Sequence, residues 1–188
     1  MSNCSPSFLS LAMDSALMHS EPNWLRMRRS ASLESFKELG FPSVSLEDWK
    51  YTNLKSIEDI TFRNINAIDA QIEVQVPSCL QEPISVVMVN GCYREDLSNL
   101  TGLPKGITLL PLESALLVKE KLFRETLGSM ACSEDKALTA LNAAALNTGF
   151  FLHVAEGVVL EKPIAIFWFT GHAEDSIIMF PRNLIVLG

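Results

Sequence analysis

Cysteine and histidine are the residues in this chain best suited to bind a metal or to carry redox chemistry. The four cysteines contain no Cys-x-x-Cys pair, and none is followed by a histidine at ligand spacing. A structural zinc site or a thioredoxin-like site normally uses such closely spaced ligands. The sequence therefore predicts no metal site, and we expect reduced, structural thiols at Cys4, Cys79, Cys92 and Cys132.

One short motif matches part of a catalytic pattern. His172-Ala173-Glu174 fits the His-x-Glu of zinc deaminases, but the Pro-Cys-x-x-Cys partner of that motif is absent from the sequence. The sequence also lacks a phosphate-binding loop and the usual zinc-hydrolase, serine-hydrolase and dinucleotide-binding motifs. His153 falls in a β-like run on the same side as Phe151, where we expect a structural histidine. The sequence thus predicts no catalytic residue and no cofactor-binding residue.

Composition and charge are typical of a soluble globular chain. Hydrophobic residues make up 48% and charged residues 20% of the 188 residues, and the formal net charge is -7. An acidic chain repels phosphate backbones, so we expect no nucleic-acid partner. The longest apolar run, residues 164–169, is far shorter than the ~20 residues that span a membrane, so we expect no membrane contact. Residues 1–21 contain no lysine or arginine and do not resemble a targeting peptide, which favours a cytoplasmic protein.

The spacing of apolar residues predicts helices in the first part of the chain. We expect one helix within residues 5–19 and a second helix that runs from residue 23 to 39 and ends at Gly40. Three arginines spread around nearly half of the second helix, which favours a solvated face over a binding surface. They are Arg26, Arg28 and Arg29.

A short helical turn is expected after the second helix. Ser45 is followed three residues later by Asp48, which fits the looser form of the capping box and introduces Trp49 and Tyr51. Large amphipathic rings usually bury their bodies and bond through a polar tip. We therefore expect Trp49 and Tyr51 to pack into the interior.

Strand patterns follow in the middle and at the end of the chain. An apolar run before the turn dipeptide Asn90-Gly91 predicts a β-hairpin. Pro111 is expected to begin a helix, and an alanine-rich helix within residues 133–146 is expected to be buried. After Gly149 the chain consists of short apolar runs separated by polar turns, which indicates stacked or sandwiched strands.

Two segments carry longer motifs. Residues 41–54 contain Asp48-Trp49-Lys50-Tyr51-Thr52, and residues 140–188 contain Leu-Asn-Ala-Ala-Ala-Leu-Asn, Gly-Phe-Phe-Leu-His-Val and Pro-Arg-Asn-Leu-Ile-Val-Leu-Gly. These motifs resemble the SufD family, subunits of the SUF machinery that assembles iron-sulfur clusters, and the Trp-Lys-Tyr-Thr element favours the D subunit over its B paralogue. We expect a structural role for the motif residues Asp48, Trp49, Lys50, Tyr51 and Thr52.

The resemblance implies an α+β fold: a helical N-terminal region with short strands, followed by the first coils of a right-handed parallel β-helix. It places a mostly helical region with a small β-hairpin in residues 1–148 and the start of the β-helix in residues 149–188. We expect a truncated chain that corresponds to the N-terminal part of a longer protein. Its last strands, within residues 164–188, are expected to leave an open β edge through which this fragment self-associates.

The resemblance also implies a function, that of a non-catalytic subunit of the scaffold on which iron-sulfur clusters are built, and thus a protein that is not an enzyme. It implies a SufB-like paralogue and a SufC-like ATPase as partners, no cofactor in this fragment, and an iron-sulfur cluster held transiently by the full complex. The contact regions of the family lie beyond Gly188, so no functional residue is transferred to this chain. Two other functions stay open: a self-contained β-helix domain that binds a carbohydrate or a protein, and a small hydrolase whose site is assembled from distant residues.

Overall fold

The structure is a computed structural model and describes residues 10–11, 21–65, 73–75, 84–131, 135–171 and 176–188. The chain forms two compact units, each assembled from three separate stretches of sequence. Unit 1 consists of Met1–Asn64, Lys119–Asn147 and Asp175–Phe180, and unit 2 consists of Ile65–Val118, Thr148–Glu174 and Pro181–Gly188. The units therefore differ from the expected division into residues 1–148 and 149–188, because late segments of the chain join early ones in both units.

Helices make up most of unit 1. The longest is α2, Asn23–Leu39, which ends as predicted at Gly40, where a φ of 66° turns the chain and the Gly40 N–H donates to the Phe36 carbonyl. Among the described residues, no helix is long and apolar enough to cross a lipid bilayer. The shorter elements of unit 1 are η2 (Glu47–Trp49), α3 (Lys55–Glu58), α5 (Glu120–Thr126) and the parallel pair β1 (Arg63–Asn64) and β7 (Ile177–Ile178).

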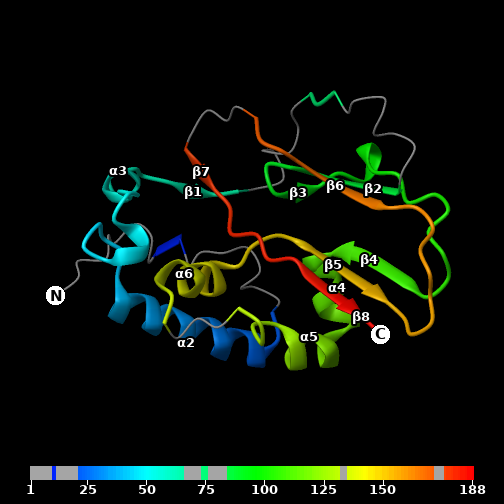
Figure 1. Ribbon diagram of the computed structural model, residues 1–188, viewed down its shortest axis with the longest axis horizontal. Coiled ribbons are helices and arrows are strands. Elements are labelled where there is room, and N and C mark those ends of the chain that lie inside the picture. The colour runs from blue at the N-terminus through cyan, green and yellow to red at the C-terminus, as the bar shows by residue number, and fades with distance from the viewer. Residues whose placement is uncertain (1–9, 12–20, 66–72, 76–83, 132–134, 172–175) are drawn as a thin grey trace. The chain divides into compact units, whose positions relative to one another are not determined.

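Helix α6, Ala137–Ala145, packs along α2 in unit 1 (Figure 1). Its buried face is formed by Ala140, Leu141, Ala144 and Ala145, and the same hydrophobic cluster contains Phe36 of α2. Small alanine side chains let the two helix backbones approach closely. The prediction that the alanine-rich helix is buried is therefore confirmed.

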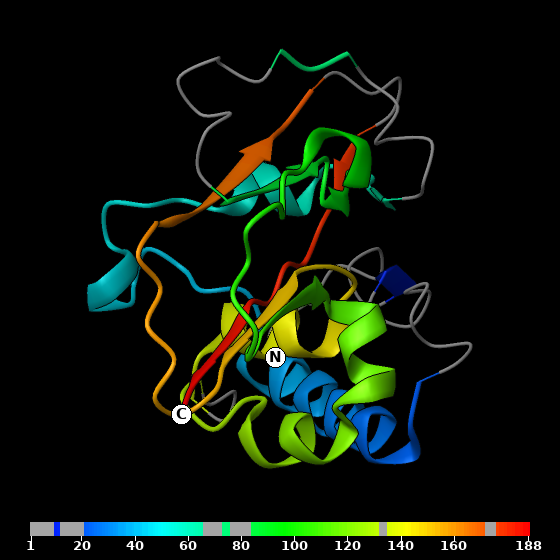
Figure 2. The same cartoon turned by 90° about the vertical axis from the view of Figure 1, so that its right-hand side faces the viewer.

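Two three-stranded sheets form the frame of unit 2 (Figures 1 and 2). In each sheet the central strand has one antiparallel and one parallel neighbour. The first sheet has the order β3 (Cys92–Tyr93), β2 (Ile84–Val89), β6 (Ile164–Phe169), and the second has the order β4 (Ile107–Pro111), β5 (Phe150–Val154), β8 (Leu184–Leu187). Helix α4 (Leu112–Val118) and the turn η5 (Glu95–Leu97) complete the unit.

One face of each sheet contributes side chains to the hydrophobic core of unit 2. Val86 and Met88 of β2 share a hydrophobic cluster with Leu109 of β4 and Leu152 of β5. Residues two apart in a strand point to the same face, so these side chains meet in one layer. The opposite face of β2 is buried in a second cluster, and every residue of this strand is buried. A continuous apolar run is what such a doubly covered strand requires.

The predicted hairpin at Asn90-Gly91 is confirmed. β2 and β3 pair antiparallel with Val89 opposite Cys92. Asn90 and Gly91 have φ values of 45° and 82°, the left-handed geometry that a two-residue hairpin turn demands and that this dipeptide favours. The Asn90 Oδ1 also accepts a hydrogen bond of 2.9 Å from the Gly171 N–H, so the turn holds the chain that leaves β6.

The expectation for Pro111 is wrong. Pro111 is the last residue of β4 and pairs with Phe150, and the helical region after it is divided into α4 and α5. β4 is an edge strand, where a residue without an N–H is tolerated.

Of the helix expected within residues 5–19, only Ser10 and Leu11 lie among the described residues, and both are helical.

Candidate functional site

Residues 41–54, which contain the Asp48–Thr52 motif and are called the motif segment below, border a pocket in unit 1 with a volume of about 590 Å³. Three parts of the chain form its wall: the end of α2, the segment that leads into η2, and the first turn of α6. We call it the motif pocket. Its lining residues are Leu39, Gly40, Pro42, Leu46, Glu47, Asp48, Trp49, Asp135, Lys136, Ala137, Leu138 and Thr139.

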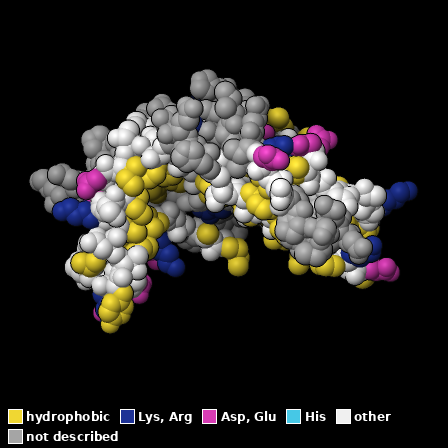
Figure 3. All heavy atoms as spheres, turned by 90° about the horizontal axis from the view of Figure 1, so that it is seen from above, with side chains coloured by type: hydrophobic (Ala, Val, Ile, Leu, Met, Phe, Trp, Pro, Cys, Tyr) yellow, Lys and Arg dark blue, Asp and Glu magenta, His cyan; other side chains and the backbone are white. Residues whose placement is uncertain are grey.

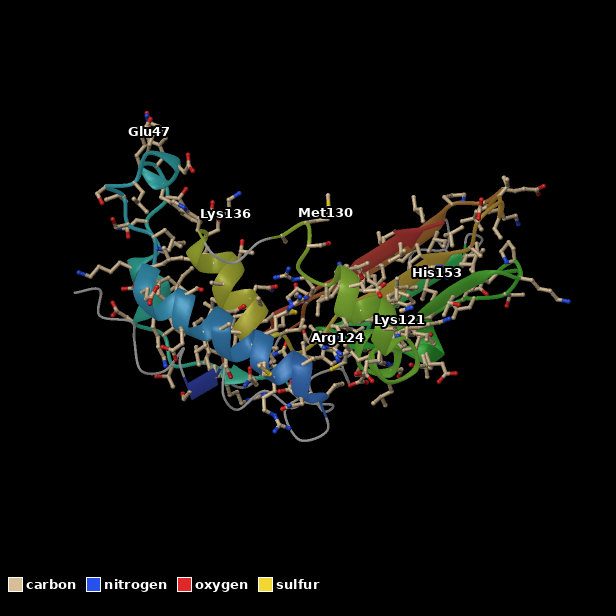
Figure 4. The ribbon with its side chains drawn as sticks, turned by 90° about the horizontal axis from the view of Figure 1, so that it is seen from below. Glu47, Lys121, Arg124, Met130, Lys136 and His153 are labelled. Carbon is tan, nitrogen blue, oxygen red and sulfur yellow. The ribbon has the colours of Figure 1, made fainter. Side chains whose placement is uncertain are left out.

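Tight backbone turns place the motif beside α6. The chain leaves α2 at Gly40, and the Trp49 N–H donates to the Leu46 carbonyl at 2.9 Å, which closes the turn of η2. The Thr52 N–H then donates to the Trp49 carbonyl at 2.9 Å. Figure 4 shows Glu47 and Lys136 on the same side of unit 1, one on η2 and the other at the start of α6.

The side-chain charge of the motif pocket is mainly negative. Glu47, Asp48 and Asp135 contribute carboxylates, and Lys136 is the one basic side chain among the lining residues. Glu47 forms an ion pair with Lys50, whose Nζ also lies 5.1 Å from the centre of the Tyr51 ring. The pocket therefore combines apolar walls with carboxylates and suits binding, and none of its lining residues is a histidine or a cysteine.

The expectation that Trp49 and Tyr51 are interior residues is wrong for Tyr51. Tyr51 is 91% exposed, whereas Trp49 is half-buried at the pocket wall. The expected capping box is also absent, because Leu46 holds the N-cap position of η2 and no side chain caps it. A structural role of the motif residues Asp48 to Thr52 stays a prediction.

The solvated arginine face expected on α2 is wrong for Arg29, whereas Arg26 and Arg28 are exposed. Arg29 is 3% exposed; its Nη1 lies 3.5 Å from Glu21 Oε2 and donates to the Leu146 carbonyl at 2.7 Å. Arg28 Nη1 donates to the Leu127 carbonyl, and its guanidinium lies 6.0 Å from the Trp24 ring. These arginines join α2 to the chain that follows α5 and α6.

Burial shifts the pKa values of both Glu21 and Arg29. Desolvation raises the pKa of Glu21, and the nearby Arg29 and Arg26 lower it only in part. Desolvation likewise lowers the pKa of Arg29, and Glu21 opposes that shift. Both charged forms are thus disfavoured by burial, which is the usual cost of an ion pair removed from water.

The candidate metal ligands do not come together in the part of the chain that the structure describes. No group of three or more histidine, cysteine or acidic side chains there could hold a metal ion. His153 stacks on Phe151 with ring centres 6.3 Å apart, which confirms that the two share a side of the strand. The Cys92 side chain is half-buried. Cys4, Cys79, Cys132 and His172 lie outside the described residues.

Sequence comparison identifies the family. The pattern described as the SufBD protein N-terminal region matches residues 9–166, and the chain belongs to this family. The Bacillus subtilis (strain 168) proteins named iron-sulfur cluster assembly protein SufB and SufD are 25% identical over 189 residues and 26% identical over 181 residues. These alignments cover 90% and 89% of this chain and 39% of each relative, so the chain spans about two fifths of their length.

A shorter match has higher identity. A SufBD family protein of Staphylococcus epidermidis, SERP0500, is 33% identical over 82 residues, which cover 44% of this chain and 17% of that protein. The resemblance drawn from the motifs is therefore confirmed at the level of the SufBD family. The two Bacillus relatives are matched almost equally, so the comparisons do not separate a SufB from a SufD type.

Proposed function

We propose that this chain corresponds to the N-terminal part of a non-catalytic subunit of a SUF scaffold complex for iron-sulfur cluster assembly. The observation that carries the proposal is the family match over residues 9–166. We further propose a cytoplasmic location, in line with the sequence.

We propose a SufD type rather than a SufB type. The support is the Asp48-Trp49-Lys50-Tyr51-Thr52 motif, because its Trp-Lys-Tyr-Thr element is similar to that of the D subunit. The proposed partners are a SufB-like paralogue and a SufC-like ATPase. An iron-sulfur cluster belongs to the complex as its product, and this chain is proposed to retain none.

We also propose that the strands after Gly149 form the first coil of a right-handed parallel β-helix. In support, β5, β6 and β7 belong to three different sheets, and β8 then pairs in parallel with β5. A chain that returns beside its own earlier strand after visiting two other sheets follows the path of one coil. The open edge of β8 is proposed to mediate self-association of the chain.

Coexpression tests the proposed function. The tagged protein, in its full natural length, is produced together with the SufB-like and SufC-like proteins of the same genome and purified through its tag. We expect a complex that contains all three proteins, and anaerobic reconstitution of the 188-residue chain alone is expected to leave no stoichiometric iron or sulfide. The proposal is wrong if neither partner copurifies, or if the chain alone binds a stable cluster that is lost on Cys79→Ser or Cys92→Ser.

A further inference from the structure

We propose that the motif pocket binds a short segment of a partner protein that presents a large apolar side chain next to a lysine or arginine. The proposal goes beyond the scaffold function and does not depend on it, because it rests on the shape and charge of unit 1. It assigns the motif segment a recognition role in addition to any structural one.

The apolar part of the pocket can hold a large side chain. Its volume of about 590 Å³ lies within the range of about 300 to 1,000 Å³ that is typical of ligand pockets. Leu39, Leu46 and Leu138 line it together with the half-buried ring of Trp49. Burial of an aliphatic or aromatic side chain against these groups would remove apolar surface from water on both partners.

The charged part of the pocket favours a cation. Three carboxylates, those of Glu47, Asp48 and Asp135, stand against the ammonium group of Lys136. Glu47 is already paired with Lys50, so one negative charge is left in excess. The start of α6 contributes a positive helix end, but Leu39 and Gly40 bring the negative end of α2 to the same pocket. Each helix end is equivalent to about half an elementary charge, so the two nearly cancel and the carboxylates decide the sign.

Two of the carboxylates are well placed to receive the cation. Within the described part of the chain, the ion pair at this pocket joins Glu47 to Lys50, and no ion pair is described for Asp48 or Asp135. The net charge of the chain, -7, adds a long-range attraction for a basic partner. A lysine or arginine beside the apolar anchor can therefore pair with Asp48 or Asp135.

The surroundings of the pocket point to a protein rather than to a small molecule. Exposed apolar side chains continue from the pocket along the same segment, at Leu39, Val44, Leu46 and Tyr51. Figure 3 shows hydrophobic side chains along the projection on its left side, to which residues 41–54 belong. Exposed apolar patches with a polar rim mark protein interaction sites, and tyrosine and tryptophan are enriched in them.

A random library of 12-residue peptides displayed on phage tests the proposal on the 188-residue chain. We expect the enriched peptides to share a large apolar residue within three positions of a lysine or arginine. The chain is then labelled with 5-fluorotryptophan, which gives fluorine signals for Trp24, Trp49 and Trp168, assigned by tryptophan-to-phenylalanine variants. Addition of a selected synthetic peptide is expected to shift the Trp49 signal and leave the other two in place.

Matched variants separate the pocket from its surroundings. Leu46→Ser is expected to weaken peptide binding at least threefold. Met27→Ser removes an exposed apolar side chain of α2 outside the pocket lining and is expected to leave binding unchanged (exposures 52% and 67%). Asp48→Asn with Asp135→Asn is expected to weaken binding by up to about fivefold, since the exposed ion pair of the peptide cation contributes about 0.2 to 1 kcal/mol. The charge-matched control is Asp59→Asn with Glu120→Gln, two exposed positions of unit 1 outside the pocket.

Several outcomes would overturn the proposal. These are the absence of any enriched peptide, enrichment of acidic or uncharged peptides, an unmoved Trp49 signal, and an equal loss of binding in the control variants. Fluorine spectra of each free variant check that it is folded. Because the partners of a SUF complex take no part in this experiment, its failure would leave the coexpression result untouched.

Discussion

Arg29 and Glu21 form an ion pair inside unit 1, with 3.5 Å between Arg29 Nη1 and Glu21 Oε2 and with both side chains almost inaccessible to solvent. The same Arg29 Nη1 donates to the carbonyl of Leu146, immediately after α6. One guanidinium thus pairs with a buried carboxylate and donates to a carbonyl at a helix end. The position of α2 against the end of α6 depends on this residue.

Arg29→Met is therefore expected to be strongly destabilising. It leaves the Glu21 carboxylate buried without its nearest cation, which typically costs about 3 to 5 kcal/mol. Arg26→Met is the matched control, because Arg26 lies 4.0 Å from Glu21 but its side chain is 56% exposed, and a loss below about 1 kcal/mol is expected. Urea unfolding of the variants measures the difference, and equal losses would contradict the assigned role of Arg29.

The raised pKa of Glu21 predicts a pH dependence of stability. The folded protein holds the Glu21 proton more tightly than the unfolded chain does, so this group favours folding below its ordinary pKa of 4.5. That contribution is lost as the pH rises through the raised pKa. Wild-type protein is expected to lose stability relative to Glu21→Gln between pH 4.5 and pH 7. Urea unfolding at several pH values checks the sign, and a relative gain over this interval would refute it.

Gly149 is expected to be the least replaceable of the described glycines in unit 2. A Cβ at this position would lie 1.9 Å from the Arg182 carbonyl oxygen, where the chain approaches the segment before β8. Gly157 has a φ of 74° but no atom within 4 Å of such a Cβ, so it serves as control for the backbone effect alone. Gly157→Ala should cost about 1 to 2 kcal/mol. Gly149→Ala should exceed that by about 1 to 3 kcal/mol through overpacking, as thermal unfolding would measure.

Local signals explain which parts of the fold were predictable. The helix that ends at Gly40 and the hairpin at Asn90-Gly91 depend on residues that are neighbours in sequence, and both predictions were correct. The burial of Arg29 could not be read from its helix, because its partner Leu146 lies more than a hundred residues away. The prediction of a solvated face considered α2 alone, without the segments that pack against it.

The motif pocket was missed for the same reason. Its wall joins Trp49 to Lys136 and Leu138, and no local pattern links these two segments. The family resemblance pointed to the correct segment, residues 41–54, but the general rule that large rings are buried gave the wrong environment for Tyr51. An exposed aromatic residue in a family motif is the signal that favours recognition over packing.

Tyr51→Ala is expected to change stability by less than about 0.5 kcal/mol, because a side chain that is almost fully exposed loses little on truncation. Trp49→Ala should cost about 1 to 2 kcal/mol, since its ring is half-buried at the pocket wall. Parallel urea unfolding curves of the two variants give the comparison. A larger loss for Tyr51→Ala would restore the interior packing that the sequence suggested.

The free edge of β8 predicts that the chain self-associates. Among the described strands, β8 pairs only with β5, and its Ile185 and Leu187 are exposed. A sheet edge of this kind offers unpaired N–H and carbonyl groups and apolar side chains to a second copy. Sedimentation over a range of protein concentrations should therefore reveal a dimer or a larger species.

A lysine placed on this edge should oppose the association. Charged side chains on edge strands disfavour pairing between copies, so Ile185→Lys is expected to shift the chain toward the monomer. Val159→Lys adds the same charge at an exposed position of unit 2 outside the strands and should leave the distribution as it is. If the wild-type chain is monomeric at every concentration, or if both lysine variants dissociate the dimer equally, then the edge of β8 is not the contact between copies.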